Sequence, residues 1–133
     1  MAYGRKDYFW GVAPEKSVFG ELQTQWRRNS ANNVTSGASA AIGTYTVSEG
    51  YLLQIDNIQI SCSKPGMQYF YLKINTVIEI VVWFDTTLNI AMGEGGTLIV
   101  NGGEAVEWWF QNNDGVTASF VQFSTGFLQQ TIV

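Results

Sequence analysis

The sequence predicts an all-β domain: an antiparallel two-sheet sandwich of jelly-roll type, with about eight strands. Three observations predict it. From residue 43 onward, short runs of alternating apolar and polar residues are separated by turn signals, with no helical period between them. Without crossover helices, the strands must pair mainly antiparallel. Cys62 is the only cysteine, so the Cys–Trp–Cys spacing of an immunoglobulin-like sandwich, the alternative, is absent.

The first 42 residues predict an extended N-terminal arm and linker, which leaves residues 43–133 for the sandwich domain. Apolar side chains in residues 1–28 follow no sustained period and are interspersed with Gly and Pro. A short helix over residues 17–28 is an alternative, with Ser17 as its N-cap and Gly20 weakening it. Residues 29–41 have the small, polar composition of a linker.

Four strands are expected in the first part of the domain, over residues 43–47, 51–63, 69–75 and 77–84. In the second of these, the apolar phase slips at Asp56-Asn57, which predicts a bulge where the strand turns between sheets. The strand over residues 77–84 is apolar on both sides. Its alternation places Ile78, Ile80, Val82 and Phe84 on one face, and Val77, Glu79, Val81 and Trp83 on the other.

Four further strands are expected over residues 88–92, 97–100, 104–112 and 116–125, with a hairpin signal at Asn101-Gly102. Trp108 and Trp109 are adjacent, so they point to opposite faces of their strand. Trp108 is in phase with Val106 and Phe110, which assigns it to the core. Trp109 then points outward.

The residue types exclude most catalytic chemistry. The chain has no histidine, which removes Ser-His-Asp and Cys-His nucleophiles and histidine-ligated zinc. Glu104 and Glu107 face opposite sides of their strand, whereas Glu79 and Glu107 could share an outer face if their strands are neighbours. No glycine-rich segment has the Lys and Ser/Thr of a phosphate loop. We expect no catalytic residue, no cofactor and no metal.

The charges are distributed unevenly along a chain whose formal net charge is −4. Residues 1–28 hold five basic and three acidic residues, and the remainder holds two basic and eight acidic ones. The acidic domain argues against nucleic-acid binding, and a basic leading segment favours docking onto a neighbouring copy. The alternative is that these charges only solvate a loop. No apolar run is long enough for a membrane helix, and no signal peptide is expected at the start, so we expect synthesis in a cytoplasm.

The composition favours a surface covered by partners, since charged residues make up only 14% of the chain and aromatic residues another 14%. We expect a homo-oligomer, with a trimer favoured. For Trp109, cover by residues 1–42 is one interpretation, and an outer patch with Trp83 and Tyr71 for a partner subunit or a sugar ring is the other. The predicted partner-binding residues are Phe9, Trp10, Phe19, Trp26, Arg27, Arg28, Trp83 and Trp109.

Several segments resemble small virion proteins of tailed bacteriophages. They are GTYTVSEGY at residues 43–51 with the LLQIDNIQIS strand after it, EGGTLIV at 94–100, and the aromatic strand at 116–125. The resemblance spans residues 43–126 and implies a non-enzymatic virion protein, a capsid decoration or accessory protein. It also implies binding to virion proteins such as the major capsid protein, often through an extended arm. A carbohydrate-binding module or receptor-binding component is the alternative.

Overall fold

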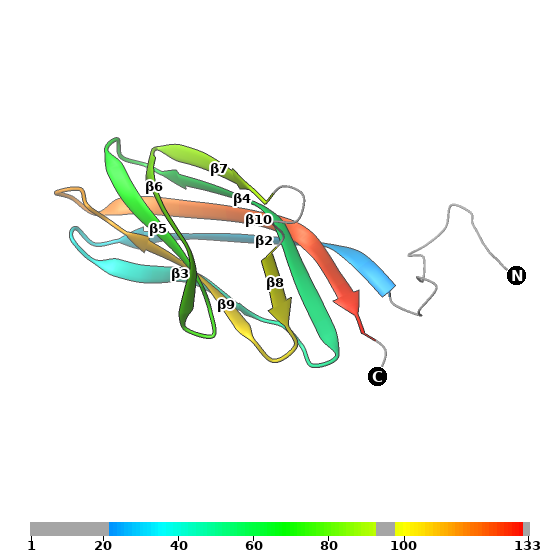
Figure 1. Cartoon of the computed structure of the whole chain (residues 1–133). Helices are drawn as coiled ribbons and strands as arrows, with labels where there is room; N and C mark the ends of the chain where they lie inside the picture. The colour runs from blue at the N-terminus through cyan, green and yellow to red at the C-terminus, as the bar shows by residue number, and fades with distance from the viewer. Residues whose placement is uncertain (1–21, 93–97, 132–133) are drawn as a thin grey trace, which may run out of the picture.

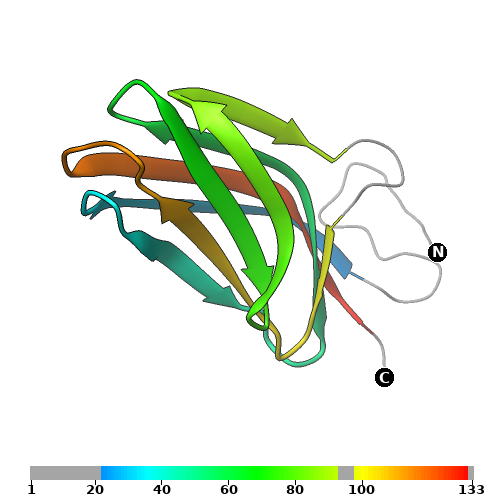
Figure 2. The same ribbon diagram turned by 60° about the vertical axis from the view of Figure 1, so that its left-hand side comes forward.

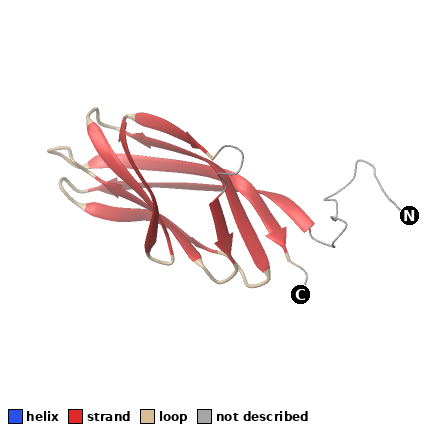
Figure 3. Ribbon diagram, viewed as in Figure 1, coloured by secondary structure: helices blue, strands red, loops and turns tan. Residues whose placement is uncertain are grey.

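The computed structural model of the chain describes residues 22–92 and 98–131 (Figure 1). These residues form strands and no helix (Figure 3), so none of them belongs to a helix that could cross a membrane. The strands are β2 (Leu22–Val34), β3 (Ser39–Thr46), β4 (Tyr51–Cys62), β5 (Met67–Ile74), β6 (Val77–Asp85), β7 (Thr87–Ala91), β8 (Leu98–Asn101), β9 (Ala105–Gln111) and β10 (Ala118–Gln130). All eight strands predicted after residue 42 are present.

Two layers of antiparallel strands pack face to face, in the strand order of a jelly roll (Figures 1 and 2). One sheet has the order β2-β10-β4-β7, and the other has the order β6-β5-β9-β3. β8 pairs with the first part of β4, beyond the end of β7. The chain switches sheets between β6 and β7, which share the single pair Asp85 and Thr87. The predicted sandwich of jelly-roll type is confirmed.

The core lies between the two sheets, on the inward faces of strictly alternating strands. Every second residue of β5 and β9 is buried. Trp108 is fully buried, as predicted, and its indole Nε1 donates a hydrogen bond to Ser124 Oγ on the facing sheet. Ser124 Oγ in turn donates to Gln122 Oε1, and Gln122 Nε2 donates to Ser30 Oγ. These hydrogen bonds join the two layers, because Trp108 lies on β9 in one sheet and the other three residues lie on β10 and β2 in the other. Each of the four side chains has a hydrogen-bond partner, as buried polar groups require.

The bulge predicted in the long strand β4 is confirmed. The register between β4 and β10 shifts at Thr125 and Gly126, which leaves Asp56 without a partner residue on β10. Gly126 is required there, because a Cβ atom at this position would collide with the backbone carbonyl of Gln54. The extra residue keeps Ile55 and Ile58 both in the core.

A second bulge, in β6, corrects the predicted faces of that strand. Leu72 pairs with Ile80 and Lys73 with Ile78, so Glu79 is the extra residue. One extra residue moves the rest of a strand to the opposite face. Ile78 therefore lies on the outer face beside Lys73, and its assignment to the face of Ile80 was wrong. Its exposed fraction of 49% agrees with this position.

The predicted boundary at residue 42 is also wrong. β2 pairs with β10 along all 13 of its residues, and β3 begins at Ser39. Trp26, Val34 and Ile42 are buried in the core. Residues 22–42 therefore belong to the sandwich, and the alternative of a helix is excluded from Leu22 onward. Residues 1–21 lie outside the described residues, so an arm remains a prediction for that segment alone.

Candidate interaction surfaces

The outer face of the β6-β5-β9 sheet collects four outward-facing aromatic side chains, of which Trp83 is exposed and Tyr69, Tyr71 and Trp109 are half-buried. Register places Tyr69 opposite Trp83, and Tyr71 between Val81 on one side and Trp109 on the other. We call this surface the aromatic face. Its members are Met67, Tyr69, Tyr71 and Lys73 from β5, Ile78, Val81, Trp83 and Asp85 from β6, and Glu107, Trp109 and Gln111 from β9.

The rings of the aromatic face form one connected group at the β5–β6 side. Tyr69 and Trp83 stack with their ring centroids 3.6 Å apart. Tyr69 also packs against Tyr71 at 5.3 Å. Trp83 is nonetheless 51% exposed, because its outer surface has no neighbour among the described residues. Stacked rings of this kind are rigid and present a large apolar area.

Polar contacts hold the β9 side of the same face. The Lys73 ammonium lies 3.9 Å from the centre of the Trp109 ring, and Trp109 Nε1 donates to Glu107 Oε1 at 3.1 Å. The Tyr71 hydroxyl donates to Gln111 Oε1 at 2.7 Å. One cation and one carboxylate thus offset each other beside the tryptophan, so this side of the face is close to neutral.

Exposed apolar side chains are concentrated on β6 and the start of β5. Met67, Val77, Ile78, Val81 and Trp83 are five of the nine large apolar residues exposed in the described part of the chain. β6 is also an edge strand along most of its length, since its pairing with β7 is limited to Asp85 and Thr87. An apolar surface therefore adjoins backbone groups that have no strand partner in the described residues.

The outer face of the opposite sheet has a different chemistry, dominated by side-chain amides. We call it the amide face. Arg27 is the one charged residue among the strand-paired residues that point to this side. The amides are Gln23, Gln25, Asn29 and Asn33 from β2, Gln129 from β10, Gln54, Asn57 and Gln59 from β4, Asn89 from β7 and Asn101 from β8.

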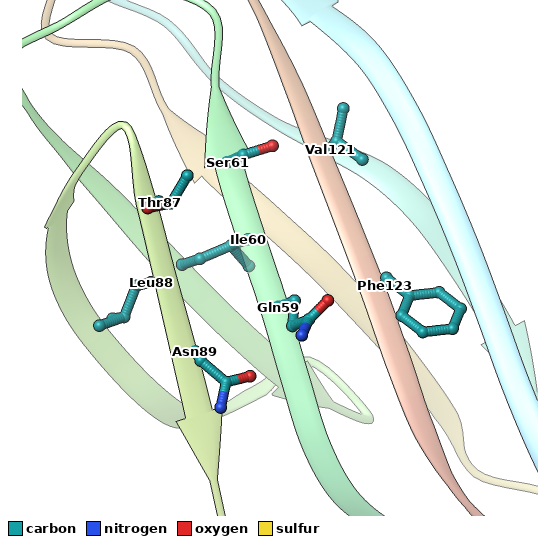
Figure 4. A pocket seen from close by; sticks show the side chains of 8 residues that line it. All are labelled: Gln59, Ile60, Ser61, Thr87, Leu88, Asn89, Val121 and Phe123. Carbon is teal, nitrogen blue, oxygen red and sulfur yellow. The ribbon is translucent and has the colours of Figure 1, made fainter.

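An open hollow of about 350 Å³ lies on the amide face where β10, β4 and β7 run side by side (Figure 4). Phe123 and Val121 flank it on β10, and the amides of Gln59 and Asn89 project from neighbouring strands. Its complete lining is Gln59, Ile60, Ser61, Thr87, Leu88, Asn89, Val121 and Phe123. No lining residue carries a charge.

The structure separates the predicted partner-binding residues into groups. Trp83 and Trp109 lie on the aromatic face, and Arg27 is exposed on the amide face. Phe9, Trp10 and Phe19 lie outside the described residues. Sequence reasoning missed Tyr69, Ile78 and the amides, although outward positions of alternating strands were the available signal.

Trp26 and Arg28 act inside their own domain. Trp26 is buried, with an exposed fraction of 7%, and its ring stacks on that of Trp108 at a centroid distance of 6.4 Å. Its prediction as a partner-binding residue was wrong, because β2 turns it into the core. Arg28 Nη2 donates to the carbonyl of Thr44 at 3.1 Å, and its guanidinium lies 5.3 Å from the Tyr45 ring. Arg28 therefore joins β2 to β3 at the open side of the sandwich.

The reassignment of β2 also removes the charge argument for the arm. The surplus of basic residues in residues 1–28 came from Arg27 and Arg28, both of which lie on β2. Residues 1–21 alone hold three basic and three acidic residues. Electrostatic attraction to an acidic domain therefore gives this segment no preference for a neighbouring copy.

The acidic side chains of the described residues lie apart from one another. No three His, Cys, Asp or Glu residues within them lie close enough to hold a metal ion. Glu79 lies at the bulge of β6 and Glu107 on β9, with β5 between these strands. The carboxylate pair considered from the sequence is thus separated by an intervening strand.

The chain is similar to solved structures but to no family model. No protein-family model matches the sequence, and no curated protein matches it. One similar solved structure is a chain titled "Bacillus endospore appendages form a novel family of disulfide-linked pili". It has 14% sequence identity to this chain and a TM-score of 0.37. The similarity covers 92% of this chain and 100% of that chain. At this TM-score it supports no inference about this protein.

Proposed function

We propose that this protein is a non-enzymatic structural subunit that associates with other copies of itself through the aromatic face and the adjoining edge of β6. The observation that carries the proposal is the grouping of Met67, Ile78, Val81 and Trp83 beside a strand edge. Removing such a surface from water stabilises association, and the exposed edge offers hydrogen bonds to a second chain. The absence of histidine from the sequence supports a non-enzymatic role.

A second copy is the partner that fits this surface best. Edge strands of identical chains pair readily, because each supplies the backbone donors and acceptors that the other lacks. Lys73 and Glu107 offset each other at one end of the face, and Asp85, opposite Met67, is a single carboxylate at its other end, so the face carries little charge for two copies to repel. A two-fold dimer would use this surface on both copies, whereas the favoured trimer requires the β6 edge to meet a different surface of the next copy.

The resemblance of residues 43–126 to bacteriophage virion proteins supports a virion as the setting of this subunit. In that setting it is a capsid decoration or accessory protein bound to the major capsid protein. This part of the proposal rests on the sequence pattern. Quantitative mass spectrometry of purified virions tests it: we expect a fixed copy number per particle that is a multiple of the oligomer size. Absence of the protein from purified particles would contradict the virion setting and leave self-association untouched.

Light scattering coupled to size-exclusion chromatography tests self-association directly. We expect the full-length protein to be oligomeric at tens of micromolar, and Trp83→Ser or Val81→Asp to lower its mass. Phe127→Ser is the matched control, because Phe127 is exposed to 38% on the opposite sheet and its replacement should leave the mass unchanged. Circular dichroism establishes that the variants are folded. A monomeric wild type, or an unchanged mass for both β6 variants, would overturn the proposal.

A further inference from the structure

The hollow on the amide face brings polar side chains of β4 and β7 beside two apolar side chains of β10. Register places Phe123, Gln59 and Asn89 in one row across β10, β4 and β7. The neighbouring row holds Val121, Ser61 and Thr87. Adjacent strands are about 4.8 Å apart, so the two amides lie side by side on neighbouring strands, and so do the two hydroxyls. Figure 4 shows the Asn89 side chain between β7 and β4 and the Gln59 side chain between β4 and β10, with the Phe123 ring on the other side of β10.

The amides of the hollow are available to a ligand. Gln111 and Gln122 use their amides within the protein, on Asn113 and Ser30 respectively. By contrast, the side chains of Gln59 and Asn89 form no hydrogen bond with another described residue. Each offers a donor and an acceptor on one planar group. The hollow of about 350 Å³ is also within the size range of small-molecule sites.

The lining selects the chemical class of the ligand. Phosphates, carboxylates and ammonium groups bind most strongly to partners of opposite charge, and this lining has none. An apolar peptide would leave the amides without partners in a dry contact, which is costly. A neutral sugar satisfies both parts of the site, because its hydroxyl groups both donate and accept while its C–H surface packs on an aromatic ring.

We propose that this hollow binds a neutral oligosaccharide, with Gln59 and Asn89 hydrogen-bonding sugar hydroxyls and Phe123 packing against a sugar ring. Ser61 and Thr87 supply further hydroxyl partners. The site differs from the aromatic patch that the sequence suggested for sugars, which lies on the opposite sheet. It is also independent of self-association through the aromatic face, so either proposal can fail alone.

Titration calorimetry with the full-length protein tests the site, using hexasaccharides of glucose (α-1,4 and β-1,4), mannose and N-acetylglucosamine, and hexagalacturonate as the acidic probe. We expect saturable binding of at least one neutral probe and none of the acidic one. Phe123→Ala should weaken binding about tenfold through loss of ring packing, and Gln59→Ala about three- to tenfold through loss of a hydrogen bond. Gln59→Ala leaves no cavity, which keeps the test valid if Phe123→Ala destabilises the domain.

Two controls distinguish this site from its rivals. Phe127→Ala changes an aromatic residue of the same strand outside the hollow and should leave affinity unchanged. Binding in the hollow should shift the side-chain amide NMR signals of Gln59 and Asn89 while leaving the fluorescence of Trp83 and Trp109 unchanged. Quenched tryptophan fluorescence with loss of binding in Trp83→Ala would move the sugar site to the aromatic face and overturn this assignment. Failure of every neutral probe to bind at millimolar concentration would also overturn it.

Discussion

Trp108 and Ser124 are linked across the core, the indole Nε1 of one donating to the hydroxyl of the other at 2.9 Å. The pair ties β9 in one sheet to β10 in the other, and both residues are buried. Ser124 is also the donor to Gln122, so a single hydroxyl satisfies two larger side chains. Ser124, a small residue, therefore supplies the hydrogen-bond acceptor of Trp108, the largest fully buried side chain.

We expect Ser124→Ala to destabilise the domain by about 1–3 kcal/mol, because it leaves the buried Trp108 N–H without an acceptor. Urea denaturation followed by circular dichroism measures the change. Ser119→Ala, on the outward side of the same strand, is the control and should change the free energy of unfolding by less than about 0.5 kcal/mol. Equal effects at the two positions would show that the Trp108 hydrogen bond contributes little.

The neighbouring tryptophans of β9 should respond differently to replacement by alanine. Trp108→Ala removes a fully buried ring and should cost about 3–5 kcal/mol in the free energy of unfolding. Trp109→Ala removes an outward ring held by Lys73 and Glu107, so the domain should still melt cooperatively. Thermal melting of both variants decides this. A larger loss for Trp109→Ala would contradict the burial of the two side chains.

Gly126 should not tolerate a side chain. Its Cβ would collide with the Gln54 carbonyl at the bulge, and relieving such a contact costs about 1–3 kcal/mol. Gly115→Ala is the matched control, since a Cβ there would meet nothing within 4 Å. We expect the denaturation midpoint to fall for Gly126→Ala and to stay within error for Gly115→Ala. A fall in both would point to a general effect of alanine in place of glycine.

Truncation separates residues 1–21 from β2. A chain that begins at Leu22 should keep its β-type circular dichroism and cooperative melting, because it retains every described strand. A chain that begins at Gly43 should lose both, since it lacks β2 and the core residues Trp26 and Val34. If the chain that begins at Leu22 is molten, residues 1–21 are part of the core. If it is folded but no longer oligomeric, the predicted arm contributes to self-association.

The strands after residue 42 could be predicted because most of their inward positions are apolar and their turns carry Gly, Pro or Asn. β2 could not, because its inward positions include Ser30 and Asn32, which pair with Gln122 and Phe120. A strand at the edge of the sheet, with polar residues on both sides, has no period-two apolar signal. Its linker-like composition was therefore misleading.

The two interaction surfaces were predictable only in part. Trp83 and Trp109 were identified as outward aromatic residues from alternation alone. Their grouping with Tyr69 and Tyr71 depends on how β5, β6 and β9 align, and the sequence does not specify the register of separate strands. The Glu79 bulge, which brings Ile78 to the surface, likewise appears only once β6 is paired with β5. The amide face remained unrecognised because its members are dispersed over five strands.

The two surfaces lie back to back on sheets that, in a sandwich, are about 10 Å apart. A two-fold assembly that uses the aromatic face of both copies would therefore leave the hollow of each copy directed outward. Several weak sites displayed on one rigid particle bind a repetitive ligand far more tightly than one site does, because each attachment raises the local concentration for the next. Because the two surfaces lie on opposite sides of the sandwich, self-association through one would leave the other free, and the assembled copies together would bind a repeating glycan with higher avidity.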